Sequence, residues 1–296
     1  MSDVIASPST RIHALRRGVD IDALAARLGR TTITREDVDG SAAPGVPAAP
    51  AAPDATRYWD VDHAAQGPVR VEPLGRIDRV AAANLSAAQA LIPAVTHHDR
   101  ADLTEVEAFR AMLRAEAAAA GIKLTTLAFH VKALTRTLRA FPRFNTSLTA
   151  DGLNLVHKDY VHVGIAVDTA QGLVVPVIRD ADRLGLFAIA RAIADLAALA
   201  QSRRLRPEMM GGASMTITNL GGIGGTAFTP IVNPPEVAIL GITRTEVTPV
   251  WNGTAFVPRP MVPLDLSYDH RVINGADAAR FLTHYAGLLT DPRLLV

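Results

Sequence analysis

The 296-residue sequence contains no cysteine. Disulfide bonds, a cysteine nucleophile and metal sites with thiolate ligands are therefore excluded. Aromatic residues make up only 5% of the chain and the formal net charge is +1, so no basic excess is available to neutralise nucleic-acid phosphates. The composition predicts a protein that binds no nucleic acid.

Long apolar runs are also missing. Although 49% of the residues are hydrophobic, no stretch approaches the roughly 18 apolar residues needed to cross a bilayer. The first residues, MSDVIASPSTR, lack the basic start and apolar segment of a signal peptide. The sequence therefore predicts a cytoplasmic protein with a sizeable core and no membrane contact.

A tract rich in alanine and proline divides the chain. Residues 41–53 read SAAPGVPAAPAAP, and ten of these 13 residues are Ala or Pro. Such a tract cannot bury a core, and it is typical of a stiff, extended linker. We predict a small domain over 1–40, a linker over 41–71 and a large domain over 72–296. A loop within one domain is the alternative.

The first forty residues show the pattern of two short helices. Ser7 is placed to cap a helix that has Pro8 at its first position, and Gly18 is placed to end it. A second helical face is formed by Ile21, Leu24 and Leu28. Two helices in about 35 residues are close to the lower size limit for independent folding.

This segment resembles the peripheral subunit-binding domain of 2-oxo acid dehydrogenase acyltransferases. The matching residues are Ser7, Pro8, Arg11, Gly18, Val19, Asp20, Ile33, Asp37 and Val38. The resemblance implies docking of 2-oxo acid dehydrogenase or dihydrolipoamide dehydrogenase subunits. A Gly-Thr-Gly loop of the family reads Ala26-Arg27-Leu28 here, and a basic position of the first helix is Leu15. A helical pair that binds nothing is therefore the alternative.

The large domain mixes helical and strand patterns. Helices are expected over 74–91, 105–116, 124–141, 186–199 and 275–289. Strands are expected over 161–167, 173–178, 213–219, 237–243 and 262–268. Thr104 and Glu107 have the spacing of a capping box, 168–172 reads as a hairpin loop and Asn252-Gly253 as a tight turn. Because strands and helices do not alternate strictly, we predict an α+β fold with a mixed sheet.

A histidine near the C-terminus is the first candidate for chemistry. The stretch SYDHRVINGADAARFL, residues 267–282, places His270 at the end of an expected strand, before a turn and a helix. Strand ends before turns are common catalytic positions, and a histidine titrates near neutral pH, which suits a general base. On spacing alone, a surface histidine that caps a helix is the favoured interpretation.

The wider sequence around this histidine resembles a known family. DHRVINGADA is similar to the His-x-x-x-Asp-Gly signature shared by chloramphenicol acetyltransferase and the catalytic domains of 2-oxo acid dehydrogenase acyltransferases. Further similar segments are 92–97, 142–145, 163–169, 172–177, 216–222, 230–233, 235–241 and 249–251. The details are most similar to dihydrolipoyl acetyltransferases of bacterial pyruvate dehydrogenase. The resemblance implies a chloramphenicol acetyltransferase-like mixed sheet with helices.

The resemblance also implies a reaction, the transfer of an acetyl group between dihydrolipoamide and coenzyme A. A free thiol has a pKa of roughly 8.5, so a positioned base such as His270 helps it to attack at neutral pH. Without a cysteine, direct attack by the substrate thiolate is the simpler scheme. The family uses a strand hydroxyl to stabilise the oxyanion, and the matching position here is Thr218.

Asn274 stands where the family commonly has an aspartate that faces an arginine. At the matching position of the first helix the chain has Asn84, so both charged partners are absent together. We predict that a neutral pair replaces the ionic one and that the amide of Asn274 anchors the turn behind His270. The glycine-rich stretch 221–225 lacks the pattern of a phosphate loop and predicts a tight turn beside the site.

Substrates and partners follow from the same resemblance. Coenzyme A is expected as a substrate, but its contact residues cannot be assigned, and no metal site is expected. No lipoyl-domain motif is present, so the lipoyl group is expected in trans or from a longer chain. A homotrimer is implied, with 294–296 joining trimers into a cubic or icosahedral core. A non-catalytic structural or partner-binding component is the alternative function.

Overall fold

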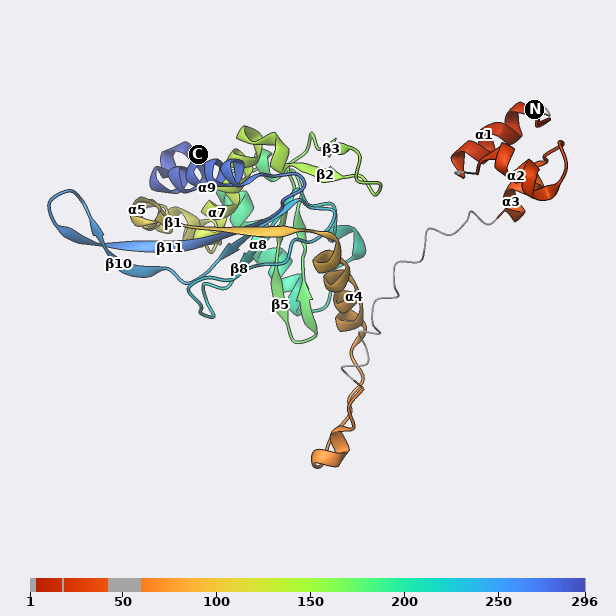
Figure 1. The fold of residues 1–296 in the computed structure, drawn as a ribbon. Helices are drawn as coiled ribbons and strands as arrows, with labels where there is room; N and C mark the ends of the chain where they lie inside the picture. The colour runs from red at the N-terminus through yellow and green to blue at the C-terminus, as the bar shows by residue number, and fades with distance from the viewer. Residues whose placement is uncertain (1–3, 18, 42–59, 296) are drawn as a thin grey trace. The chain divides into compact units, whose positions relative to one another are not determined.

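The computed structural model describes residues 4–17, 19–41 and 60–295. The chain divides into two compact units, Met1–Glu72 and Pro73–Val296, shown in Figure 1. Most of the predicted linker tract lies outside the described residues, as does Gly18, the predicted end of the first helix.

Unit 1 contains α1 (Pro8–Arg16), α2 (Ile21–Leu28) and α3 (Arg35–Gly40). The predicted cap of the first helix is confirmed, because the Ser7 side chain accepts a hydrogen bond from the backbone N–H of Thr10 at 3.1 Å. The prediction of only two helices is wrong. Thr34 and Asp37 form a reciprocal capping box, which starts a third helix too short to show periodicity.

The core of unit 1 is small. Its buried hydrophobic residues are Ala14, Ile21, Leu24, Ala25, Ile33 and Val38. Leu28, which the sequence pattern placed on the inner face of the second helix, is 42% exposed. The helix ends there at Gly29, which has a left-handed φ of 66° and therefore turns the chain away.

Unit 2 is built on a seven-stranded mixed sheet in the order β1-β11-β9-β8-β4-β7, with β10 paired to β11. The strands are β1 (Ala94–Asp102), β4 (Val163–Ile165), β7 (Val177–Ile178), β8 (Met215–Asn219), β9 (Ala238–Ile242), β10 (Glu246–Trp251) and β11 (Phe256–Asp269). The pairings of β8 with β4 and with β9 are parallel, and the other pairings of this sheet are antiparallel. Two small hairpins stand apart, β2–β3 (Thr146–Leu148, Leu155–His157) and β5–β6 (Val167–Thr169, Gly172–Val174).

A layer of helices packs against the sheet. It contains α5 (Thr104–Met112), α6 (Arg114–Ala119), α7 (Thr126–Ala140), α8 (Leu186–Gln201) and α9 (Gly275–Thr290). In contrast, α4 (Arg76–Leu91) is exposed along most of its length and lies outside this layer. In Figure 1, α9 runs beside the ribbons of β1 and β11, and α7 lies against α8 and α9. Ten residues of α7 are buried, so this helix forms the centre of the helical layer.

The core lies between this helical layer and the sheet. Its largest fully buried side chains include Tyr268 of β11, Phe129 of α7, and Phe281 and Tyr285 of α9. Phe144 stacks on Phe281 with ring centroids 4.1 Å apart. Burying aromatic side chains from strand and helix together stabilises the layers against one another, and it fixes the end of β11 relative to the start of α9.

Most of the predicted elements have observed counterparts, with several corrections. The expected strands 161–167 and 173–178 are each divided in two, into β4 and β5 and into β6 and β7, and the strands β1, β2, β3 and β10 were not expected. The helix expected over 105–116 is split into α5 and α6, and the capping box of Thr104 and Glu107 does not form. The Asp102 carboxylate instead accepts hydrogen bonds from the backbone N–H and hydroxyl of Thr104. Glu107 pairs with Arg110 on its own helix. The carboxylate of Asp102 therefore replaces that of Glu107 as the acceptor for the Thr104 N–H.

The α+β class and the mixed sheet are confirmed. The β5–β6 hairpin occupies the predicted 168–172 loop region, and the Asn252-Gly253 turn joins β10 to β11. Within the part of the chain that the structure describes, none of the helices has the length and apolar character required to traverse a bilayer.

Candidate active site

A closed turn after β11 positions His270. The preceding residue, Asp269, is only 3% exposed, and its carboxylate binds the Arg271 guanidinium through two contacts of 2.9 and 2.7 Å. The backbone N–H groups of Val272 and Ile273 both donate to the Asp269 carbonyl at 3.0 Å. The carboxylate raises the pKa of Arg271, so the pair stays charged and holds the turn.

The His270 backbone is fixed while its ring is exposed. Its N–H donates to the carbonyl of Pro93 at 3.1 Å, which ties the turn to the residue before β1. The ring lies 5.8 Å from that of Tyr268, and no hydrogen bond of its nitrogens occurs among the described residues. Arg143 braces the turn from the far side through a 2.6 Å hydrogen bond to the Val272 carbonyl. The fixed backbone therefore determines where the imidazole lies, and the exposed ring is available to a substrate.

Asn274 caps α9. Its side-chain oxygen accepts a hydrogen bond from the backbone N–H of Asp277 at 2.9 Å, the interaction expected of an N-cap residue. The predicted partner, Asn84, lies exposed on α4 and forms no hydrogen bond with Asn274 in the described structure. The expected neutral pair is thus absent within one chain, and the Asn274 oxygen caps the helix instead.

Thr218 lies on β8, in the interior of the sheet. It is partly buried and stands opposite Gly241 of β9, which stands opposite Asp265 of β11. Side chains of register partners point to the same face of a sheet. The Thr218 hydroxyl therefore projects from the same sheet face as Asp265, next to a position that carries no side chain.

The glycine-rich stretch after Thr218 is a tight turn, as predicted. The backbone N–H groups of Ile223 and Gly224 donate to the carbonyl of Leu220 at 2.8 and 3.0 Å. Gly225 has a φ of 89°, a conformation that favours glycine. The next regular element is β9 rather than a helix, so the stretch has no helix N-terminus to bind a phosphate.

One chain does not bring the two candidate residues together. Thr218 lies two strands from Asp265 in the register, and His270 follows Asp265 by five residues along β11. A strand rises about 3.4 Å per residue and neighbouring strands lie about 4.8 Å apart, so the two Cα atoms are roughly 20 Å apart. A direct relay between His270 and Thr218 of the same chain is excluded by this separation.

A buried polar cluster beneath Thr218 was not predicted. Two residues before it on β8, the hydroxyl of Thr216 donates to Glu236 at 2.9 Å, and the Asn233 amide donates to the same oxygen. Burial raises the pKa of Glu236 and lowers that of Lys158. Glu236 follows two prolines in the sequence, a context that gives no signal of an interior carboxyl group.

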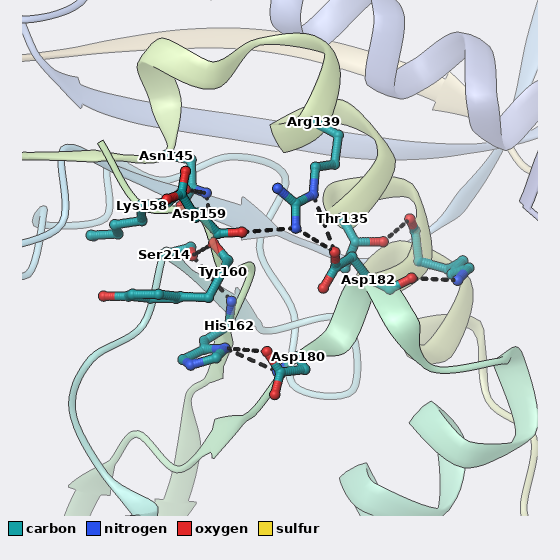
Figure 2. Close-up of polar contacts among 11 residues, drawn as sticks. Thr135, Arg139, Asn145, Lys158, Asp159, Tyr160, His162, Asp180, Asp182 and Ser214 are labelled. Carbon is teal, nitrogen blue, oxygen red and sulfur yellow. Dashed lines mark hydrogen bonds and ion pairs between the residues drawn. The ribbon is translucent and has the colours of Figure 1, made fainter. Parts of the chain in front are cut away.

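A second polar network joins the helical layer to the loops, and Figure 2 shows it in close-up. Arg139 of α7 binds the Asp182 carboxylate at 2.6 Å and the carbonyl of Asp159 at 3.1 Å. Lys132, about two turns earlier, donates to the carbonyl of Leu184 at 2.7 Å. These contacts fasten α7 to two loops.

His162 belongs to this network and is not a catalytic candidate. In Figure 2 its ring lies against that of Tyr160, with centroids 4.2 Å apart. Its Nδ1 accepts a hydrogen bond from the backbone N–H of Asp180 at 2.9 Å. Burial lowers its pKa, which is consistent with a neutral ring that accepts this bond. In the described residues no cluster of three or more His, Asp or Glu side chains could hold a metal ion.

Comparisons with known proteins give the chain its family context. Residues 66–296 match the model of the 2-oxoacid dehydrogenases acyltransferase (catalytic domain) family. The acetyltransferase component of the pyruvate dehydrogenase complex of Cupriavidus necator is 46% identical over 98% of this chain and 55% of its own length. The Azotobacter vinelandii component is 46% identical over 99% of this chain and 47% of its own length. The chain thus spans about half the length of these relatives.

Two solved structures are similar over unit 2. One comes from a crystallographic and enzymatic study of a serine, a histidine and an asparagine in the catalytic mechanism of Azotobacter vinelandii dihydrolipoamide acetyltransferase. The other is the cubic core of the pyruvate dehydrogenase multienzyme complex. Each is 50% identical, covers 79% of this chain and 97% of the solved chain, and has a TM-score of 0.78.

Proposed function

Since the chain belongs to the family of 2-oxoacid dehydrogenase acyltransferases, we propose that it transfers an acetyl group between dihydrolipoamide and coenzyme A within a pyruvate dehydrogenase complex. The observation that supports this most is the fixed turn that presents the exposed imidazole of His270 at the end of β11. Coenzyme A is a substrate in this proposal, and a lipoyl group on another domain or chain is the acyl carrier.

Residue spacing supports the assignment of the site residues. In the Azotobacter vinelandii enzyme the serine under study lies 52 residues before the histidine, and the asparagine lies four residues after it. Thr218 and Asn274 have the same separations from His270. Threonine retains the hydroxyl of serine. We therefore propose His270 as the base, Thr218 as the oxyanion donor and Asn274 as the residue that anchors the turn.

The chemistry then needs one base and one donor. The neutral imidazole of His270 takes the proton of the attacking thiol, and the thiolate adds to the carbonyl carbon of the thioester. The tetrahedral oxyanion accepts a hydrogen bond from the Thr218 hydroxyl, a contact worth about 3 kcal/mol in comparable sites. Collapse breaks the original C–S bond, and the leaving thiolate recovers the proton from the imidazolium. No cysteine or metal takes part.

The separation of roughly 20 Å between His270 and Thr218 favours a site shared by two chains. We propose a homotrimer in which His270 of one chain lies opposite Thr218 of its neighbour, because a closed ring creates the same site at every interface. Assembly of trimers into a larger core through the C-terminal residues, docking of partner enzymes on unit 1 and a cytoplasmic location belong to the same proposal.

The test is acetyl transfer from acetyl-CoA to dihydrolipoamide by the parent chain and by its His270→Ala variant. General-base removal should lower turnover by about 10²–10⁴-fold, while the thermal unfolding midpoint should not change because the ring is exposed. Equal turnover by both proteins would remove His270 from the mechanism. An assembled parent chain inactive with acetyl, succinyl and branched acyl donors would support the alternative, a structural component.

A further inference from the structure

A second histidine of unit 2 is held by a buried carboxylate. His98 of β1 and Asp265 of β11 are register partners, and the His98 Nδ1 lies 2.6 Å from Oδ1 of Asp265. The aspartate side chain is 1% exposed and the histidine side chain 49% exposed. A buried carboxylate without a partner is strongly destabilising. The pair therefore fixes the orientation of a half-exposed imidazole, which the proposed mechanism does not use.

The pair stands in one row with Thr218. Across the sheet the register partners are His98, Asp265, Gly241 and Thr218, so their side chains share one face. Three strand spacings of about 4.8 Å place the ends of the row roughly 14 Å apart. His98 therefore lies within the reach of a long substrate arm from the proposed oxyanion donor.

Phe228 fills the gap in the row. A side chain on Gly241 would come within 2.7 Å of two atoms of the Phe228 ring, so the glycine is what lets the ring approach the sheet. The backbone N–H of Phe228 lies 3.3 Å from the other oxygen of Asp265, to which it donates. Asp265 thus holds His98 on one side and, on the other, the loop that follows Thr218.

A cavity of about 490 Å³ lies at the His98–Asp265 end of this row, and its lining includes His98, Asp265, Thr226, Thr248, Glu246 and Arg100. The loop residue Thr226 connects its wall to the turn after Thr218. Its lining has no basic excess, because the carboxylates of Asp99 and Glu246 outnumber the guanidinium of Arg100. A lining without a basic excess is poorly suited to phosphates and better suited to an uncharged chain with amide groups.

The hydrogen bond to Asp265 determines what the outer edge of His98 offers. A carboxylate only accepts, so Nδ1 carries the proton and Nε2 of the neutral ring keeps its lone pair. Nε2 lies on the ring edge directed away from Asp265. We propose that His98 is a specificity-determining residue whose Nε2 accepts a hydrogen bond from an amide N–H in the arm of a thiol substrate bound in this cavity.

The inference rests on the proposed function, since both thiol substrates of that reaction have amide-bearing arms. Acetyl transfer should be measured with His98→Phe, which keeps a flat ring without the acceptor, and with His98→Phe/Asp265→Ser. The double variant avoids an unpartnered buried carboxylate and retains an oxygen for the Phe228 N–H. His97→Phe, on the opposite face of β1, is the matched control.

We expect the KM of one thiol substrate to rise about fivefold in both variants, the loss of one neutral hydrogen bond. The kcat, the other KM and the unfolding midpoint of the double variant should stay close to the parent values. A rise confined to acetyl-CoA assigns the cavity to the pantetheine arm, and a rise confined to dihydrolipoamide assigns it to the lipoyl arm.

Unchanged KM values in the double variant would overturn the inference, as would a fall in kcat alone or an equal rise in both KM values. The same result for His97→Phe would also overturn it, because the effect would then not belong to the row. A parent chain without transfer activity would overturn the proposed function itself. When the parent chain is active, the results for the His98 variants test only the inference about His98.

Discussion

Two histidines of unit 2 occupy opposite environments. His270 stands exposed at the end of β11 with its backbone fixed and its ring unpaired among the described residues. His130 lies 2% exposed on α7, with its Nδ1 2.7 Å from the hydroxyl of Tyr285. One chain pairs the buried ring of His130, whereas it leaves the ring of His270 at the strand end open. The difference indicates that His130 serves the packing of a single chain, whereas the proposed chemistry at His270 needs groups that one chain does not bring to it.

The largest effect is expected from mixing two inactive variants. His270→Ala and Thr218→Ala each remove one half of the proposed shared site, and each alone should retain about 1% of parent turnover or less. In co-expressed mixed trimers at equal ratio, about a quarter of the interfaces join two intact halves. Turnover should therefore recover to roughly that fraction, measured as acetyl transfer by the purified mixture.

Two controls sharpen the mixing experiment. The same two variants purified separately and combined without reassembly should stay inactive. A chain with both substitutions, mixed with parent chain, should give no more activity than the intact interfaces predict. If the co-expressed mixture stayed at the level of the single variants, the shared site would be wrong and the distance argument from the sheet register would have failed.

The second effect concerns His130 and stability. Burial lowers its pKa from 6.5 to about 4, so the folded chain binds this proton less readily than the unfolded chain. The contribution to stability is present above pH 6.5 and is lost as the pH falls towards 4. It amounts to about 3 kcal/mol. Urea unfolding of unit 2 followed from pH 8 to pH 4 measures it.

His130→Gln is the matching variant, because an amide can still bond to the Tyr285 hydroxyl but does not titrate. The gap in unfolding free energy between parent and variant should shrink as the pH falls, because only the parent carries this pH dependence. If the unfolding free energies of parent and variant ran parallel over the whole pH range, His130 would not be the source of this pH dependence.

The sequence and the structure agree most where patterns are local. Ser7 and Pro8 predicted the first helix start, and His270 with its flanking segments predicted the fold through a resemblance. Long-range contacts were not predictable. The Asp102 acceptor replaced the expected capping box at Thr104, and the neighbours of Thr218 in the sheet follow from strand order, which no single stretch of sequence encodes.

The same limit explains why Asn274 was only partly understood. Its position before a helix predicted an anchoring amide, whereas its partner was expected on α4 from family resemblance. The structure uses the amide locally for the N-cap. Glu236 and Asp265 were missed altogether, because an isolated acidic residue in an apolar stretch does not reveal whether strand register will bury it against a donor.

A smaller effect on stability is expected in the network around α7, from Arg139→Ala. Its guanidinium binds Asp182 and the Asp159 carbonyl, but its side chain is 47% exposed. Solvent screening therefore limits the loss to about 1 kcal/mol of unfolding free energy, with turnover unchanged. Arg191→Ala, an exposed arginine of α8, is the control and should change neither. A loss of turnover in the Arg139 variant would show that these contacts are needed for acetyl transfer and not only for stability.

The smallest effect is expected at Asn274, where stability and turnover together show whether the residue caps the helix or acts in the reaction. Replacing the N-cap by alanine should cost about 1 kcal/mol of unfolding free energy, and turnover should fall less than tenfold because His270 is also held by Asp269 and Pro93. Asn274→Asp keeps an acceptor for the Asp277 N–H and places a negative charge at a helix N-terminus, so it should restore stability. Measuring both quantities for both variants decides the role. An alanine variant with parental stability and a hundredfold lower turnover would show that the amide acts on the substrate or on the histidine, rather than through the turn that it caps.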